Sequence, residues 1–175
     1  MAKADFKTLQ KVWRNTSLTR TRKLAIFTSL IESKLLYALS TACFTTAELR
    51  RLDGFQARCL RTILKIPAAF VSRVSNQTVR ERAGCKPLSD KLLEQQMILL
   101  GKVLRAPLES PLQRVSFIPG TLQAATYRFV RRVGRPRREW VPSVLSEVYK
   151  RGGLQDILAA TETGTTWKHF IKGGG

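Results

Sequence analysis

The segment LRRLDGFQARCLRTILKI, residues 49–66, decides the fold class. On a helix of about 100° per residue, its apolar side chains gather on one broad face and its cations on the opposite face. The apolar face holds Leu49, Leu52, Phe55, Cys59, Leu60, Ile63 and Ile66. The opposite face holds Arg50, Arg51, Gly54, Arg58, Arg61 and Lys65. This segment therefore predicts a helix that packs on a core with one side and presents a row of cations with the other.

The same helical periodicity extends over most of the chain. It predicts a short helix over residues 3–14, a long central helix from Leu18 to about Cys43, and another helix over residues 87–105. Thr45 followed by Glu48 is a capping-box pattern for the helix at 49–66, and Pro67 is expected to end that helix. Strand periodicity is absent, so the sequence predicts an all-α fold.

Weaker signals place the remaining helices. Ser75 is the expected N-cap of a short helix that ends before Gly84. Pro136 suits the first turn of a last clear helix, and two weak short helices are expected in the tail. We therefore expect an irregular bundle of about five to seven helices with a basic, partly irregular C-terminal segment. Its predicted core is Phe27, Ile31, Leu36, Leu52, Phe55, Leu60, Ile63, Leu93 and Leu100.

Pro and Gly residues suggest how the chain is divided. A helical domain is expected over residues 1–105, and residues 106–126 form a connection that contains Pro107, Pro111 and Pro119. Residues 127–175 are expected to form a basic segment, a helix and a flexible tail.

Positive charge is spread along the whole chain. Lys and Arg number 31 against 12 Asp and Glu, which gives a net charge of +19. Such a surplus indicates a polyanionic partner, of which nucleic acid is the commonest. Anionic membrane is the rival, but the sequence has no apolar run of about 18 residues, so we expect no membrane partner.

A second cationic segment is RFVRRVGRPRR, residues 128–138. The candidate nucleic-acid-binding residues of the two segments are Arg50, Arg51, Arg58, Arg61, Lys65, Arg128, Arg131, Arg132, Arg135, Arg137 and Arg138. Lys and Arg contact phosphates without reading base sequence, so the expected partner is the backbone of RNA or of an RNA–DNA or DNA duplex. Gly134-Arg135-Pro136 leaves open a minor-groove contact like that of an AT-hook, although Val133 replaces the usual preceding Arg. A merely solvated basic surface is the remaining alternative.

The residues that catalysis and metal binding require are sparse. The aspartates lie more than thirty residues apart, whereas two-metal phosphoryl transfer needs clustered carboxylates. Cys43, Cys59 and Cys85 have spacings that fit no zinc pattern. We therefore expect no catalytic residue, no metal and no cofactor. Three cysteines without a CxxC pair indicate free thiols in a reducing intracellular compartment, namely the nucleus, the cytoplasm or an organelle.

Several short motifs follow one another in a distinctive order. They are Trp13, Leu18, Lys23, Leu35-Leu36-Tyr37, the 52–64 segment, Ser75-Asn76, Val79, Ala83-Gly84, residues 100–105 with Pro107, and Gly134-Arg135-Pro136-Arg137-Arg138 with Trp140. Over roughly residues 5–145 this order resembles the region after the catalytic palm in reverse transcriptases of non-LTR (LINE-type) retrotransposons. Ala38 and Lys102 depart from the family, which usually has Gly and His there.

The resemblance implies a thumb-like domain over residues 1–105 that grips the template–primer duplex by its backbone. The family's polymerase signature, Tyr-x-Asp-Asp, is absent from this sequence, so we expect a non-catalytic fragment rather than an enzyme. Two alternatives stay open. In the first, the chain is a structural RNA-binding subunit of a ribonucleoprotein such as a ribosome. In the second, it is the C-terminal piece of a longer active RNA-directed DNA polymerase.

Overall fold

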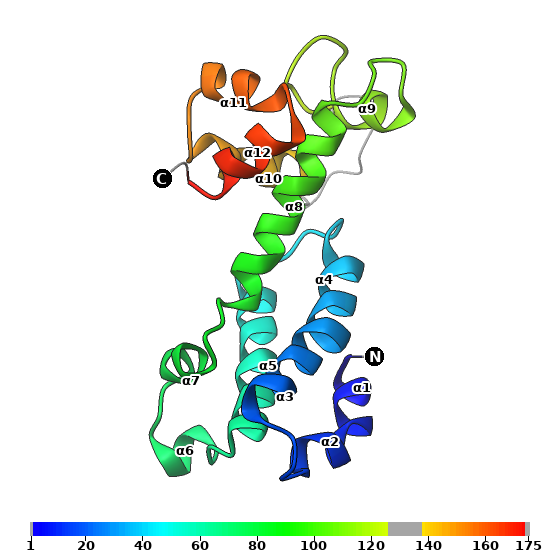
Figure 1. Ribbon diagram of the computed structural model, residues 1–175. Coiled ribbons are helices and arrows are strands. Elements are labelled where there is room, and N and C mark those ends of the chain that lie inside the picture. Colours follow the sequence, from blue (N-terminus) through cyan, green and yellow to red (C-terminus); the bar gives the residue numbers. More distant parts are fainter. Residues whose placement is uncertain (1, 126–137, 174–175) are drawn as a thin grey trace, which may run out of the picture. The chain divides into compact units, whose positions relative to one another are not determined.

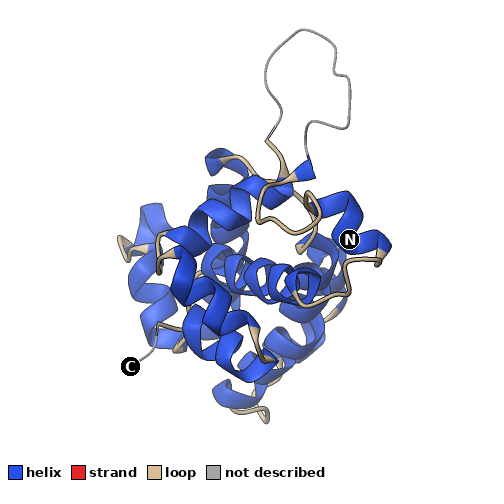
Figure 2. Cartoon of the chain, turned by 90° about the horizontal axis from the view of Figure 1, so that it is seen from above, coloured by secondary structure: helices blue, strands red, loops and turns tan. Residues whose placement is uncertain are grey.

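The computed structural model describes residues 2–125 and 138–173, and these form helices and loops (Figures 1 and 2). Apart from one isolated bridge between Phe117 and Ala124, this described part contains no β-structure. The predicted all-α class is confirmed, with more helices than the five to seven expected. Two compact units are present, one of residues 1–40 and 44–92, the other of residues 41–43 and 93–175. The division lies inside a helix rather than at residue 105, because the later turns of that helix pack with elements that follow it.

The N-terminal unit, residues 1–40 and 44–92, contains most of the helices. They are α1 (Ala2–Thr8), α2 (Gln10–Arg14), α3 (Arg20–Ile26), the π-helical η1 (Phe27–Glu32), α4 (Ser33–Leu39), α5 (Thr46–Leu64), α6 (Ala69–Ser72), α7 (Asn76–Ala83) and the first turns of α8 (Leu88–Leu104). The helix expected over 3–14 is broken at Leu9, and the long helix expected to reach Cys43 ends at Leu39.

Helix α5 begins as the sequence predicts. The Thr45 backbone N–H donates to Glu48 Oε2 at 2.7 Å, and the Glu48 N–H donates to Thr45 Oγ1 at 3.3 Å, so the capping box is formed. The helix ends at Leu64, earlier than Pro67, because Lys65 takes a left-handed conformation with φ 55°. Ser75 and Gly84 cap α7 as expected.

The core of the N-terminal unit is formed by α1, α2, α3, η1, α5 and α7. Its buried side chains are Trp13, Phe27, Ile31, Cys59, Leu60, Ile63 and Val79. The ring of Phe6 stacks on Trp13 at 5.0 Å and meets Phe27 edge-on at 6.0 Å. Four predicted core residues, Phe27, Ile31, Leu60 and Ile63, are buried here, whereas Leu36, Leu52 and Phe55 are only half-buried.

Buried charged groups of this unit, Lys23 and Glu32 among them, have polar partners. The Lys23 ammonium, 4% exposed, donates to the backbone carbonyl of Trp13 at 3.0 Å. The buried Glu32 carboxylate accepts from Gln56 Nε2 at 2.9 Å and from Lys91 Nζ at 2.5 Å. Buried charges are tolerated only with such partners, so these residues hold η1, α5 and α8 together.

The C-terminal unit, residues 41–43 and 93–175, packs around the later turns of α8. It adds α9 (Pro111–Ser116), α10 (Trp140–Tyr149), α11 (Leu154–Thr161) and α12 (Gly164–Ile171). Its buried core is Met97, Leu100, Val103, Phe117, Val144, Leu145, Val148, Ile157, Ala160, Trp167 and Ile171. The predicted core residue Leu100 is buried, and Leu93 is partly buried.

One expectation for the C-terminal unit is wrong and one is confirmed. Helix α10 begins at Trp140 and the two preceding residues are not helical, so Pro136 is not in its first turn. The two short helices expected in the tail are present as α11 and α12. Trp167 is fully buried there, and its indole N–H donates to the Met97 carbonyl at 2.8 Å. None of the helices that the structure describes is long and apolar enough to cross a membrane.

Candidate nucleic-acid interface

Four of the predicted cations of α5 reach solvent. Arg50, Arg51, Arg58 and Lys65 are all exposed. Within the described part of the chain, none of their side chains makes a hydrogen bond or an ion pair. We call Arg51, Arg58 and Lys65 the cationic row. Arg51 and Arg58 lie on α5, about 10 Å apart along its axis, and Lys65 follows the helix as its left-handed C-cap.

Arg61 is not part of this row, which corrects the prediction from the helical wheel. Its side chain is only 7% exposed. The guanidinium Nη1 donates to the Pro67 carbonyl at 3.0 Å and to Ser72 Oγ at 3.3 Å, while Nη2 donates to the Val74 carbonyl at 2.5 Å and to Asn76 Oδ1 at 3.1 Å. Arg61 therefore fixes the segment after α5, and its charge is not available to a phosphate.

The carboxylates of the N-terminal unit do not compensate the cationic row. This unit has 18 Lys and Arg against 6 Asp and Glu. Asp53 accepts from the Ser89 backbone N–H at 2.9 Å and from its hydroxyl at 2.8 Å, which fixes the start of α8. Asp5 pairs with Lys34 at 2.8 Å, Glu81 accepts from Gln77, Glu48 caps α5 and Glu32 is buried. Five of the six acids thus have partners within the unit, and the sixth, Asp90, is exposed. The exposed cations outnumber it and dominate the field outside the unit.

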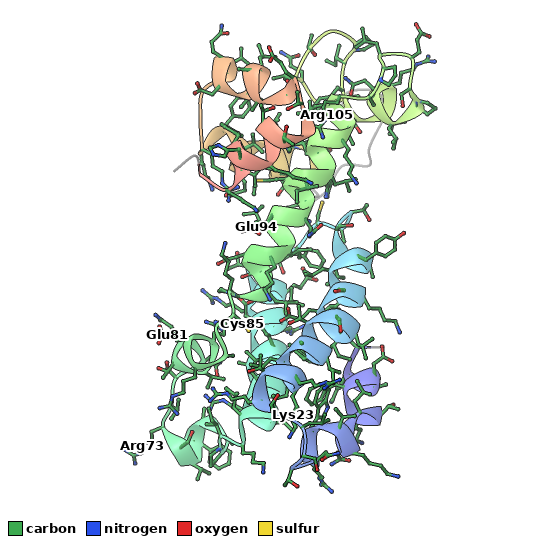
Figure 3. All side chains as sticks on the ribbon, viewed as in Figure 1. Lys23, Arg73, Glu81, Cys85, Glu94 and Arg105 are labelled. Carbon is green, nitrogen blue, oxygen red and sulfur yellow. The ribbon has the colours of Figure 1, made fainter. Side chains whose placement is uncertain are left out.

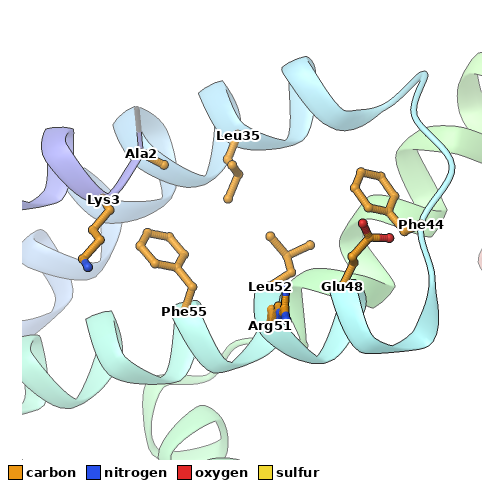
Figure 4. A pocket seen from close by; sticks show the side chains of 8 residues that line it. All are labelled: Ala2, Lys3, Leu35, Phe44, Glu48, Arg51, Leu52 and Phe55. Carbon is orange, nitrogen blue, oxygen red and sulfur yellow. The ribbon is translucent and has the colours of Figure 1, made fainter.

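A pocket of about 260 Å³ opens beside the cationic row (Figure 4). The side chains of Leu35, Leu52 and Phe55 point into it from α4 and α5. Lys3 and Arg51 are among its lining residues, so cations border an apolar hollow. This explains why the predicted core residues Leu52 and Phe55 are only half-buried.

The second cationic segment is described only at its end. Arg128, Arg131, Arg132, Arg135 and Arg137 lie outside the described residues, as do Val133 and Gly134-Arg135-Pro136. Arg138 is exposed, and its charge acts on the thiol of Cys43.

One exposed feature escaped the sequence reasoning. Helix α6 carries Phe70 and Val71, which are 86% and 62% exposed. Arg73 follows them, exposed and left-handed with φ 52°, and its side chain extends away from the ribbon (Figure 3). In the sequence, this feature is marked by the adjacent apolar residues Phe70 and Val71. They lie between Pro67 and Ser75, in a segment too short to form an amphipathic helix.

The cysteines show no arrangement suited to metal binding. No group of three or more His, Cys, Asp and Glu in the described part of the chain comes together to hold a metal ion. All three thiols are free, with Cys43 exposed and Cys59 buried. Burial raises the pKa of all three, and that of Cys59 to about 12.

We expect iodoacetamide at mildly alkaline pH to alkylate Cys43 first and to leave Cys59 unmodified until the N-terminal unit unfolds. The thiolate is the nucleophile, and a buried thiol with a pKa of about 12 forms almost none of it. Mass spectrometry of peptides from a time course, with and without denaturant, measures the rates. Equal rates for Cys43 and Cys59 in the native protein would contradict the burial of Cys59.

No protein-family model, no curated protein and no solved structure matches this chain.

Proposed function

We propose that the chain is a non-catalytic nucleic-acid-binding module that contacts the phosphate backbone through α5. The observation that carries this proposal is the cationic row, in which Arg51, Arg58 and Lys65 are exposed and unpaired among the described residues. Exposed cations without intramolecular partners are free to bind phosphates, and such contacts do not depend on base sequence. The resemblance to a reverse-transcriptase thumb agrees with this role.

The net charge supports a nucleic-acid partner but does not by itself locate the interface. A charge of +19 spread over the surface would attract any polyanion. If binding is localised, replacing a cation inside the interface lowers the affinity for nucleic acid more than replacing a cation elsewhere. The test therefore has to compare equal charge changes at different places.

The double variant Arg51→Gln/Arg58→Gln is expected to weaken binding to duplex nucleic acid and to make it less dependent on salt. Each phosphate contact contributes about −0.9 to the slope of log affinity against log salt for B-DNA. Loss of two contacts should therefore flatten the slope by about two units. Fluorescence anisotropy with labelled duplexes of unrelated sequence, at several salt concentrations, measures both quantities.

Arg14→Gln/Arg22→Gln is the matched control, since it removes the same charge from two exposed arginines on α2 and α3. We expect this control to change the slope by less than half as much. Both variants should keep the melting temperature, because none of the four side chains is buried. If the two variants flatten the slope equally, binding follows net charge and α5 is not the interface.

A further inference from the structure

We propose that the tip of α6, residues Ala68–Arg73, is a stacking platform on which Phe70 holds an unpaired nucleobase. This inference rests on the proposed function and adds a second kind of contact to it. The cationic row would hold phosphates, whereas the tip would recognise a base that is not in a duplex.

Phe70 and its neighbour Val71 are both exposed on α6. The ring is 86% exposed and the neighbouring Val71 is 62% exposed. Burial of such side chains is normally favourable, and both lie on the same four-residue helix. Leu30, another exposed apolar residue of the N-terminal unit, is aliphatic, and the exposed Tyr37 has only the small Ala38 as an exposed apolar neighbour in sequence.

Hydrogen bonds fix the backbone on both sides of Phe70. Arg61 donates to Pro67 before the tip, to Ser72 within it, and to Val74 and Asn76 after it. Ser72 Oγ also donates to the Pro67 and Ala68 carbonyls, both at 3.2 Å. Because the backbone that carries Phe70 is fixed, binding a base has to order only the few torsions of this side chain, which keeps the entropic cost low.

Two exposed cations lie near Phe70 in the sequence. Lys65 precedes the tip and Arg73 ends it, and they are the two non-glycine residues with positive φ in the described part of the chain, at 55° and 52°. Such a conformation costs about 1 kcal/mol or more at each residue. Both are C-cap residues, of α5 and α6, and they place an exposed cation before and after Phe70 in the chain. These cations are available to the phosphates that flank a stacked base.

A single aromatic ring with two cations suits a nucleobase better than a protein partner. One ring and one valine offer far less than the roughly 800 Å² that each partner buries in a stable protein interface. A base presents a flat face of the size of the ring, and its sugar can contact Val71. Stacking is independent of base identity, so the platform would accept unpaired RNA or DNA.

The test compares an oligothymidylate with an abasic strand of the same length, which carries the same phosphates without bases. The wild-type chain is expected to bind the base-bearing strand about 5- to 150-fold more tightly, the range given by one stacked base. Phe70→Ala should bind both strands about equally, with an unchanged salt slope, whereas Phe70→Trp should keep the preference. The exposure of Phe70 means that Phe70→Ala should melt like the wild type.

Tyr37→Ala is the matched control, because Tyr37 is 87% exposed on α4 and its neighbour Lys34 is paired with Asp5. This control should keep the preference for bases. A preference that survives Phe70→Ala, or that disappears in Tyr37→Ala, would overturn the inference. Phe70-dependent binding to vesicles of phosphatidylcholine and phosphatidylserine, without a preference for bases, would overturn it as well.

The outcomes also separate this inference from the proposed function. If the chain binds the abasic strand with a steep salt slope that Arg51→Gln/Arg58→Gln flattens, but shows no preference for bases, only the platform fails. If the chain binds neither strand and no duplex, the proposed function fails and the platform fails with it.

Discussion

Replacement of Gly101 by Ala is expected to lower the free energy of unfolding of the C-terminal unit by about 3 kcal/mol or more. A Cβ at Gly101 would lie 2.1 Å from the indole nitrogen of Trp167. The ring is fully buried and tied to the Met97 carbonyl on the same face of α8, so it cannot move aside without breaking that hydrogen bond. Denaturant unfolding followed by circular dichroism and tryptophan fluorescence measures the loss.

Gly54→Ala is the matched control for this prediction. Gly54 also lies inside a long helix, but a Cβ there would meet nothing within 4 Å. Because Ala is the better helix former, this variant is expected to raise stability by about 0.5–1 kcal/mol. A second control is Trp167→Leu, which should make Gly101→Ala much less harmful when the two are combined. If Gly101→Ala raises the free energy of unfolding as Gly54→Ala does, the close packing of α8 against α12 is wrong.

Replacement of Arg61 by Gln or Met is expected to destabilise the N-terminal unit by about 3 kcal/mol. The change leaves two backbone carbonyls and two side-chain acceptors without their charged donor. Arg61→Lys should recover little, because one ammonium cannot reproduce the forked geometry of the guanidinium. Thermal melts give the stability, and amide hydrogen exchange over residues 67–76 shows whether this segment opens.

Arg58→Gln is the control, since it removes the same charge one turn earlier on α5 from an exposed side chain. It should change stability by less than about 0.5 kcal/mol. The two variants should also differ in binding, with Arg58→Gln flattening the salt slope and Arg61→Gln leaving it unchanged while the chain is folded. Equal stability of both variants would contradict the structural role of Arg61.

Several residues that carried the resemblance in sequence contact one another in the fold. Arg61 donates to Asn76, and Lys23 donates to the Trp13 carbonyl. Gln56 is buried and bonded to Glu32, while Gly101 provides the space for Trp167. These residues therefore maintain packing. The resemblance to the retrotransposon thumb stays a prediction, and its shared motifs are better read as signals of fold than of binding.

Arg61 shows why the candidate site could be only partly predicted. At about 100° per residue it lies some 80° from Arg51, at the border of the cationic face. The sequence could not show that the chain after Pro67 folds back over this border and brings four acceptors to it. Arg51 and Arg58 lie nearer the centre of the face, where no segment covers them, so their exposure was predictable.

The sequence by itself determined the helical class, the apolar face of α5, its capping box and the caps of α7, because these depend on periodicity and on contacts within a few residues. Tertiary structure alone decided the features that depend on distant segments. It placed the boundary between the units inside α8, packed the supposed tail around Trp167, took Arg61 out of the cationic row and left Phe70 exposed on α6. Whether a side chain is buried depends on which distant segments of the chain pack against it. Local residue patterns carry no information about such contacts.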